Sequence, residues 1–349
     1  MTKIYCLILI LFLSTFMHAQ TPSPPDTLSF KPTGTVIAKG FLDYSMGLGN
    51  AEHVRGFNIG RAFLGYNYKF TPTWQAQLVL DGASYQSPIS GTDANTVNMY
   101  VRNAFVNWRD NGFNINFGLL GLLEYNLQET YWGHRYVEKS YQDLNNMGPS
   151  VDLGITAEYA FNPMFSVDVS FTNGQGIRKI QKSTSARYAL GITAKPIKGL
   201  VLRAYGDVYN ESEDLRDKLP EGVTGVNFKN KYITALFVGY QNKKVSLGAE
   251  YNHLYNLGFI EKKDYHGFSF YSSVKLSPKY GIYGRYDLTE SSQADNYPNS
   301  WNKLDGQLML LGFEYQPAKQ LKISPNIRNV NPTRGKSEQY FAISVDFSI

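Results

Sequence analysis

The last nine residues of the chain, Phe341-Ala342-Ile343-Ser344-Val345-Asp346-Phe347-Ser348-Ile349, decide how the whole sequence is interpreted. Large apolar side chains occupy every odd position, and small or polar side chains occupy every even position. A two-residue repeat is the signature of a β-strand whose faces meet different surroundings, because successive side chains point to opposite sides of the strand. This stretch therefore predicts a strand with one apolar and one polar face.

The same alternation recurs along the chain from Thr33 onward, with clear examples at residues 113–119, 151–159 and 245–252. An even number of such segments is typical of a bacterial transmembrane β-barrel. We predict sixteen strands, at residues 34–46, 56–69, 73–85, 95–109, 112–120, 150–161, 163–172, 184–196, 199–209, 230–241, 243–255, 265–276, 279–288, 305–316, 319–328 and 337–349.

The lengths of the connections distinguish a membrane barrel from a soluble β-sandwich, which also alternates. Tight turns such as Thr71-Pro72 and Asn162-Pro163 follow every second strand, and the other joins are mostly longer and polar. A transmembrane barrel has short turns at the periplasmic rim and long loops outside. The alternation of short and long connections therefore favours a membrane barrel with both termini on the short-turn side. The long loops are predicted at residues 86–94, 121–149, 173–183, 210–229 and 289–304.

The first twenty residues resemble a secretory signal peptide, with Lys3, an apolar run over residues 4–16 and a small residue at Ala19. Residues 21–32 are rich in Pro, Ser and Thr, which predicts a periplasmic spacer before a barrel over residues 33–349. The single cysteine, Cys6, lies in the signal segment, so we expect neither a thiol nor a lipid anchor in the exported chain. These features predict the outer membrane of a Gram-negative bacterium as the location.

The composition excludes other classes of protein. After Gln20 no run of about 18 apolar residues predicts a membrane-spanning helix. The net charge of +5 is mild for 349 residues, so no nucleic-acid partner is expected. The chain has 26 Tyr and 21 Phe residues, and aromatic clusters near strand ends, as at Tyr66 and Tyr68, are typical of membrane–water interfaces. We expect outer-membrane lipid and lipopolysaccharide around the barrel.

A barrel of sixteen strands encloses an aqueous lumen unless something plugs it. The sequence therefore predicts a porin for passive diffusion of small hydrophilic solutes or ions. A charge that faces lipid at mid-depth costs about 2–4 kcal/mol, so charged residues in the strands are expected to point inward. The side chains placed inside in this way are Arg61, Glu158, Asp168, Arg187, Lys195, Arg203, Asp207, Glu250 and Arg328.

The longest loop, residues 121–149, is the third external loop and is too aromatic for a loop in free solvent. We predict that it folds inward and narrows the pore; a folded external loop or a trimer contact is the alternative. The candidates for pore-lining or constriction residues are Glu124, Glu129, His134, Arg135, Glu138, Lys139 and Asp143 from the loop and Arg61, Arg187 and Arg203 from the wall.

Local strings in and after this loop resemble the phosphate-selective porin family of the porin O and P type, especially its Bacteroidetes form. The strings are Tyr131-Trp132-Gly133-His134-Arg135-Tyr136, Tyr141-Gln142-Asp143 and Val151-Asp152-Leu153-Gly154. The resemblance implies a homotrimer in which each subunit holds its own pore, and a basic constriction. The third loop here carries four acidic and two basic residues, so phosphate is one candidate solute among several.

No constellation for catalysis, a cofactor or a metal emerges from the spacing. The histidines are scattered, and Gly174-Gln175-Gly176 has no strand-to-helix context that would predict a phosphate cradle. His134 and Glu138 are spaced for a metal pair on a helix, which is a weak signal. Three alternatives stay open: a closed structural or adhesive barrel, an outer-membrane enzyme such as a lipase, and a channel specific for sugars or peptides.

Overall fold

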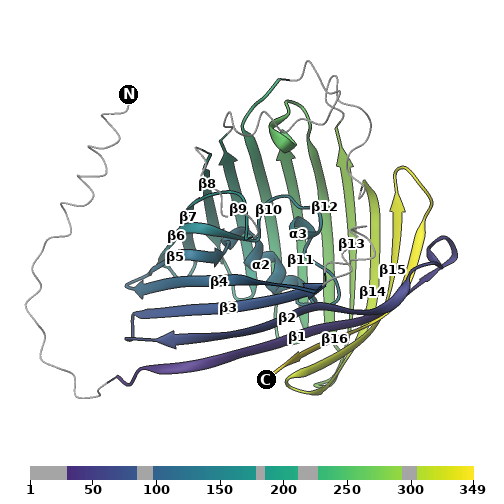
Figure 1. Ribbon diagram of the computed structural model, residues 1–349, viewed down its shortest axis with the longest axis horizontal. Coiled ribbons are helices and arrows are strands. Elements are labelled where there is room, and N and C mark those ends of the chain that lie inside the picture. Colours follow the sequence, from purple (N-terminus) through teal and green to yellow (C-terminus); the bar gives the residue numbers. More distant parts are fainter. Residues whose placement is uncertain (1–29, 85–96, 178–184, 211–226, 293–304) are drawn as a thin grey trace, which may run out of the picture. The chain divides into compact units, whose positions relative to one another are not determined.

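The computed structural model describes residues 30–84, 97–177, 185–210, 227–292 and 305–349. The predicted signal peptide, most of the predicted spacer and much of the long loops other than 121–149 lie outside these residues. Within them, sixteen antiparallel strands form a closed barrel in which each strand pairs with its neighbours in sequence and β1 pairs with β16 (Figure 1). The predicted transmembrane barrel is confirmed in strand number, order and closure.

The strand bounds agree with the predicted ones to within a few residues, and β13 and β15 run further into the external loops than predicted. No helix in the described ranges is both long and apolar enough to cross a membrane. The strands are β1 (Thr33–Leu48), β2 (Arg55–Lys69), β3 (Trp74–Ser84), β4 (Val97–Asp110), β5 (Phe113–Gly121), β6 (Val151–Asn162), β7 (Phe165–Thr172), β8 (Arg187–Ala194), β9 (Leu200–Tyr209), β10 (Lys231–Gln241), β11 (Val245–Tyr255), β12 (Tyr265–Lys275), β13 (Tyr280–Ser291), β14 (Gly306–Ala318), β15 (Leu321–Pro332) and β16 (Glu338–Ser348).

The two faces of the sheet have opposite chemistry. Outward residues are large and apolar, as at Leu311, which is 70% exposed. Inward residues include buried polar side chains such as Ser269, Ser344 and Asn252. A soluble barrel has the reverse arrangement, so this distribution is the one that a barrel surrounded by lipid requires.

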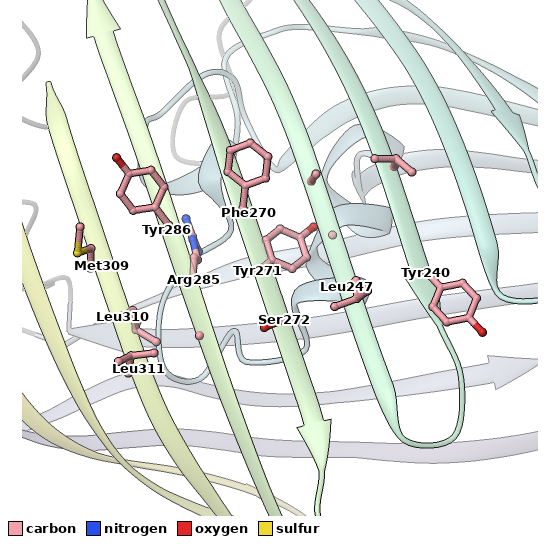
Figure 2. A pocket seen from close by; sticks show the side chains of 14 residues that line it. Tyr240, Leu247, Phe270, Tyr271, Ser272, Arg285, Tyr286, Met309, Leu310 and Leu311 are labelled. Atoms are coloured by element: carbon pink, nitrogen blue, oxygen red, sulfur yellow. The ribbon is translucent and has the colours of Figure 1, made fainter.

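An apolar groove spans β10 to β14 on the outer face (Figure 2). Leu247, Phe270 and Leu311 line it and are exposed, whereas neighbouring Tyr271 and Arg285 are buried because their side chains lie on the inner face. The groove therefore belongs to the lipid-facing surface and is not the candidate functional site.

The outward placement of Leu78 gives a first prediction. We expect Leu78→Arg to lower the free energy of unfolding in lipid vesicles by about 2 kcal/mol or more, because it places a charge in the hydrocarbon region. Gln77→Arg, one residue earlier on the opposite face, is the matched control and is expected to have little effect. Denaturant titration of both variants measures the difference; equal losses would contradict the assignment of the two faces.

Most of the charged side chains predicted to point inward lie on the inner face, among them Arg187, Arg203, Asp207 and Arg328, which are buried. The placement of Lys195 within a strand is wrong. β8 ends at Ala194, and Lys195 is exposed in the turn that follows, where its backbone N–H donates to the carbonyl of Met164. The error arises because we extended the strand through the apolar alternation into the turn.

Candidate functional site

The connection between β5 and β6, residues 122–149, is the lumen segment. Its base is closed by a hydrogen bond from the Leu122 N–H to the Ser150 carbonyl (3.0 Å). It contains the helices α2 (Leu123–Trp132) and α3 (Tyr141–Leu144). Helix α2 packs against β10, β11 and β12 (Figure 1). The wall side chains that it meets point inward: Phe237 packs on Tyr131, and the hydroxyl groups of Ser246 and Tyr271 donate to carbonyls of the helix. The segment therefore lies on the lumen side of the wall.

The end of α2 is fixed to the barrel wall. Gly133 adopts a left-handed conformation (φ 69°) and its N–H donates to the Glu129 carbonyl (2.9 Å), which ends the helix. The last carbonyls of a helix have no partner within it. Here the Ser246 hydroxyl of β11 donates to the carbonyl of Tyr131 (2.8 Å). The wall thus replaces the water that would otherwise solvate this terminus.

Trp132 is the main apolar anchor of the segment. Its side chain is 1% exposed, and its indole N–H donates to the Glu138 carbonyl (2.8 Å). The ring packs edge-on against Tyr271 and Tyr283, with centroids 5.7 and 5.9 Å away, and the Arg285 guanidinium lies 5.2 Å from its centroid. A buried aromatic ring of this size removes a large apolar area from water. This burial keeps the aromatic loop inside the barrel.

Buried arginines of the wall hold the segment by its charged and carbonyl groups. Arg187 of β8 pairs with Glu124 at the start of α2 (2.8 Å). Arg328 of β15 pairs with Glu138 (3.1 Å) and donates to the Val137 carbonyl (2.7 Å). These contacts attach the start of α2 to β8 and the stretch after α2 to β15. The two strands lie on either side of β10–β12, against which α2 packs.

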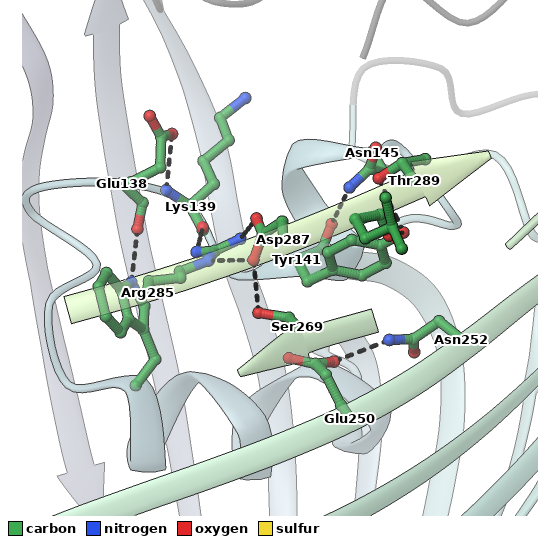
Figure 3. Close-up of polar contacts among 12 residues, drawn as sticks. Glu138, Lys139, Tyr141, Asn145, Glu250, Asn252, Ser269, Arg285, Asp287 and Thr289 are labelled. Carbon is green, nitrogen blue, oxygen red and sulfur yellow. Dashed lines mark hydrogen bonds and ion pairs between the residues drawn. The ribbon is translucent and has the colours of Figure 1, made fainter. Parts of the chain in front are cut away.

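Further polar contacts continue along β11 to β13 (Figure 3). Arg285 pairs with Asp287 (2.6 Å) and donates to the carbonyl of Lys139. The hydroxyl groups of Tyr141 and Thr289 share a hydrogen bond (3.0 Å). The Gln142 amide, in the next residue, donates to Asn252 (2.6 Å). The segment is therefore held along much of its length.

His134 and Glu138 do not form the predicted pair on a helix. Helix α2 ends at Trp132, and Glu138 pairs with Arg328 instead. The His134 ring stacks on Tyr283 (3.8 Å between centroids), and its Nε2 lies 3.4 Å from Glu314 of β14. In the described part of the chain, no group of three or more His, Cys, Asp or Glu side chains is placed to hold a metal ion.

The side of the segment away from these anchors carries its remaining charges. Arg135 contacts two carboxylates, Asp143 at 2.6 Å and Glu129 at 3.2 Å. Burial acts to raise the pKa of Asp143, but the charges of Arg135, Lys139, Arg61 and Arg102 outweigh it, and the pKa is lowered. The last two cations belong to β2 and β4, so this side of the segment faces those strands.

The part of β2, β3 and β4 opposite the segment is the facing wall, made of Arg61, Phe63, Asp81, Tyr100 and Arg102. Arg61 pairs with Asp81 (3.1 Å), which also accepts a hydrogen bond from the Tyr100 hydroxyl (2.8 Å). The guanidinium carbons of Arg61 and Arg102 lie 5.6 and 5.3 Å from the centroid of the Phe63 ring. Basic, acidic and aromatic groups thus stand across the lumen from Arg135.

Nine of the predicted site residues fall into two groups, and Arg203 stands apart. Glu124, His134, Glu138 and Arg187 make buried contacts that hold the segment; Arg203 belongs to the wall itself, where it pairs with Asp168 (2.6 Å). A second group gathers between the segment and the facing wall. Its members are Arg61, Glu129, Arg135, Lys139 and Asp143.

Arg102, Phe63 and Asp81 were not among the predicted site residues. A signal for Arg102 was present. Apolar outward residues of β4 stand at odd positions up to Val101 and at even positions from Ala104, so the alternation changes phase beside Arg102. Such a phase change marks a β-bulge.

Residues 50–346 match the family model described as putative beta-barrel porin-2, OmpL-like. No curated protein matches the chain in sequence.

Solved structures resemble the barrel along nearly its whole length. OmpF of Salmonella typhi in complex with daunomycin matches with a TM-score of 0.70 and 11% identity over 90% of this chain and 97% of that chain. The anion-selective porin from Comamonas acidovorans has a TM-score of 0.64 and 10% identity over 91% of this chain and 100% of its own. In-vitro folded OmpT of Vibrio cholerae, in its trimer form, has a TM-score of 0.60 and 15% identity over 91% and 99%. Identities this low establish the fold alone.

Proposed function

This chain belongs to the putative β-barrel porin-2, OmpL-like family, and from that premise we propose which kind of channel it forms. It is an outer-membrane porin of a Gram-negative bacterium. Its channel, in our proposal, is a general one for small hydrophilic solutes, narrowed between the lumen segment and the facing wall. The observation that carries the proposal is the attachment of the segment to the inner wall from β8 to β15, which leaves its Arg135 side toward β2 and β4.

Weak ion selectivity follows from the pairing of charges at this constriction. Arg135 is shared by Asp143 and Glu129, and Arg61 is paired with Asp81. Oppositely charged groups in contact cancel most of each other's field at the distance of a passing ion. Phosphate selectivity, the finer assignment implied by the porin O and P resemblance, needs a basic constriction. The pairing therefore favours the general channel, with phosphate as one permeant solute.

The test is a single-channel recording of the mature chain, refolded in detergent and inserted into a planar bilayer. We expect stable conductance. Under a salt gradient, we expect a reversal potential close to zero, shifted at most slightly toward the equilibrium potential of the anion. Block by micromolar phosphate would instead support a phosphate-selective porin. Absence of conductance from well-folded protein would favour the closed barrel, and hydrolysis of lipid that depends on a rim serine or histidine would favour the enzyme.

We also propose a homotrimer with a pore in each subunit, surrounded by lipid and lipopolysaccharide. Support comes from the family resemblance and from the trimer form of the structurally similar OmpT of Vibrio cholerae. The mass of the detergent-solubilised complex tests the stoichiometry. Residues 1–20 are proposed to be removed on export and residues 21–32 to remain as a spacer, which N-terminal sequencing of the outer-membrane form checks.

A further inference from the structure

Arg102 occupies a bulge in β4 at the level of the constriction. The register between β3 and β4 shifts between Val79 and Leu80, and Arg102 is the residue of β4 left without a partner. A similar shift between β1 and β2 leaves Gly60 unpaired, directly before Arg61. Bulges bend a strand locally and redirect side chains, and they occur often beside functional sites. Arg61 and Phe63 share the inner face of β2 as residues i and i+2, and the bulge in β4 directs Arg102 to the same ring.

The other guanidinium groups of the constriction already have carboxylate partners. Arg61 uses Asp81, and Arg135 uses Asp143 and Glu129. In the ranges that the structure describes, Arg102 makes no ion pair or hydrogen bond, and its contact there is with the face of Phe63. Arg102 is half-buried, so it is open to the lumen without being surrounded by bulk water.

The setting of Arg102 favours an anion over a cation. Two like charges, Arg61 and Arg135, and the carboxylates of Asp81 and Glu129 act on it. Both carboxylates are engaged by the other arginines, so their fields are largely cancelled. A guanidinium is planar and weakly hydrated and matches the two oxygens of a carboxylate or phosphate. Its contact with the ring of Phe63 restricts the plane in which it can present its donors.

We propose that Arg102 forms an oxyanion subsite in the constriction, which contacts the carboxylate or phosphate group of small anionic solutes as they pass. This inference rests on the proposed channel function and adds the class of solute that the channel favours. The subsite makes the channel slightly anion-preferring although its third loop is acidic.

The experiment measures permeability ratios in planar bilayers, with potassium chloride, potassium acetate and potassium phosphate in separate arms. For Arg102→Gln we expect the ratio of acetate to potassium permeability to fall by about three-fold or more, because the narrow part of the lumen loses an unpaired cation. Arg102→Lys is expected to keep the preference for chloride over potassium, because the positive charge remains. It is expected to lose the advantage of acetate over chloride, because lysine lacks the planar guanidinium that binds both oxygens of a carboxylate. Comparison of the acetate and phosphate arms shows which oxyanion the subsite favours.

Arg109→Gln is the matched control, since Arg109 is exposed near the periplasmic end of the same strand, and its ratios are expected to match the wild type. Arg102→Cys provides a second route, because the only native cysteine is Cys6. A cationic thiol reagent is expected to restore the anion preference of this variant, and an anionic reagent is expected to reverse it. Ratios that stay at the wild-type value in both the Gln and Cys variants would overturn the subsite while leaving the channel intact. A wild-type protein without conductance would instead overturn the channel itself.

Discussion

Replacement of residues 123–147 by a short Gly-Ser link is expected to raise the single-channel conductance about two-fold or more, because an unobstructed sixteen-stranded barrel holds a wide aqueous lumen. The segment fills part of that lumen with large side chains, including Trp132, Tyr136 and Tyr141, all of them buried against the inner wall. Its removal is expected to leave the sheet closed, since the segment takes no part in strand pairing.

The deletion is geometrically simple. Leu122 and Ser150 are already joined by a backbone hydrogen bond of 3.0 Å, so a few residues can close the connection, and a short loop costs little entropy. The control is a two-residue Asn-Gly turn in place of the exposed residues 333–337, which join β15 to β16 on the same side of the barrel. This control is expected to keep the wild-type conductance. An unchanged conductance in the deletion variant would show that the segment does not limit the current.

Most of the barrel could be predicted because its information is local. Each strand carries its own two-residue repeat, and each short turn carries its own Pro, Gly or Asn, so no long-range contact is needed to find them. An inward position was predicted for the third loop because a loop that contains Trp132 and Tyr136 needs an apolar surface to cover it, and both side chains are buried.

The contacts that hold the lumen segment to the wall were not predictable, because they join residues that are far apart in sequence. Glu138 meets Arg328, which lies 190 positions later, and Tyr136 meets Glu314, 178 positions later. The alternation shows that Arg328 faces inward but does not show which part of the lumen it reaches. Helix α2 was missed because the face that it buries is partly polar. Glu124 and Gln128 are buried together with Trp132, so no continuous apolar stripe predicts a helix.

Arg187→Met is expected to lower the free energy of unfolding by about 3–5 kcal/mol, the usual loss when one partner of a buried ion pair is removed. The Arg187 side chain is 2% exposed and lies between Glu124 and Asp207, whose side chains are 4% and 0% exposed. Methionine fills similar space but leaves two carboxylates buried without their cation. Denaturant titration in detergent or lipid measures the loss of unfolding free energy, with the folded fraction read from the heat-dependent shift of the band on a gel.

An exposed ion pair is the appropriate control. Lys229 and Glu261 are joined across the surface, with the lysine side chain 57% exposed, so Lys229→Met is expected to change the free energy of unfolding by less than about 1 kcal/mol. The triple variant Glu124→Gln, Arg187→Met, Asp207→Asn removes the charges together and is expected to be more stable than Arg187→Met alone, because no carboxylate is then left uncompensated. If the triple variant loses as much stability as the single one, or if Arg187→Met behaves like Lys229→Met, the arginine does not hold α2 to β8 and β9 by its charge. In that case, the packing of Trp132 alone would have to keep the segment inside the barrel.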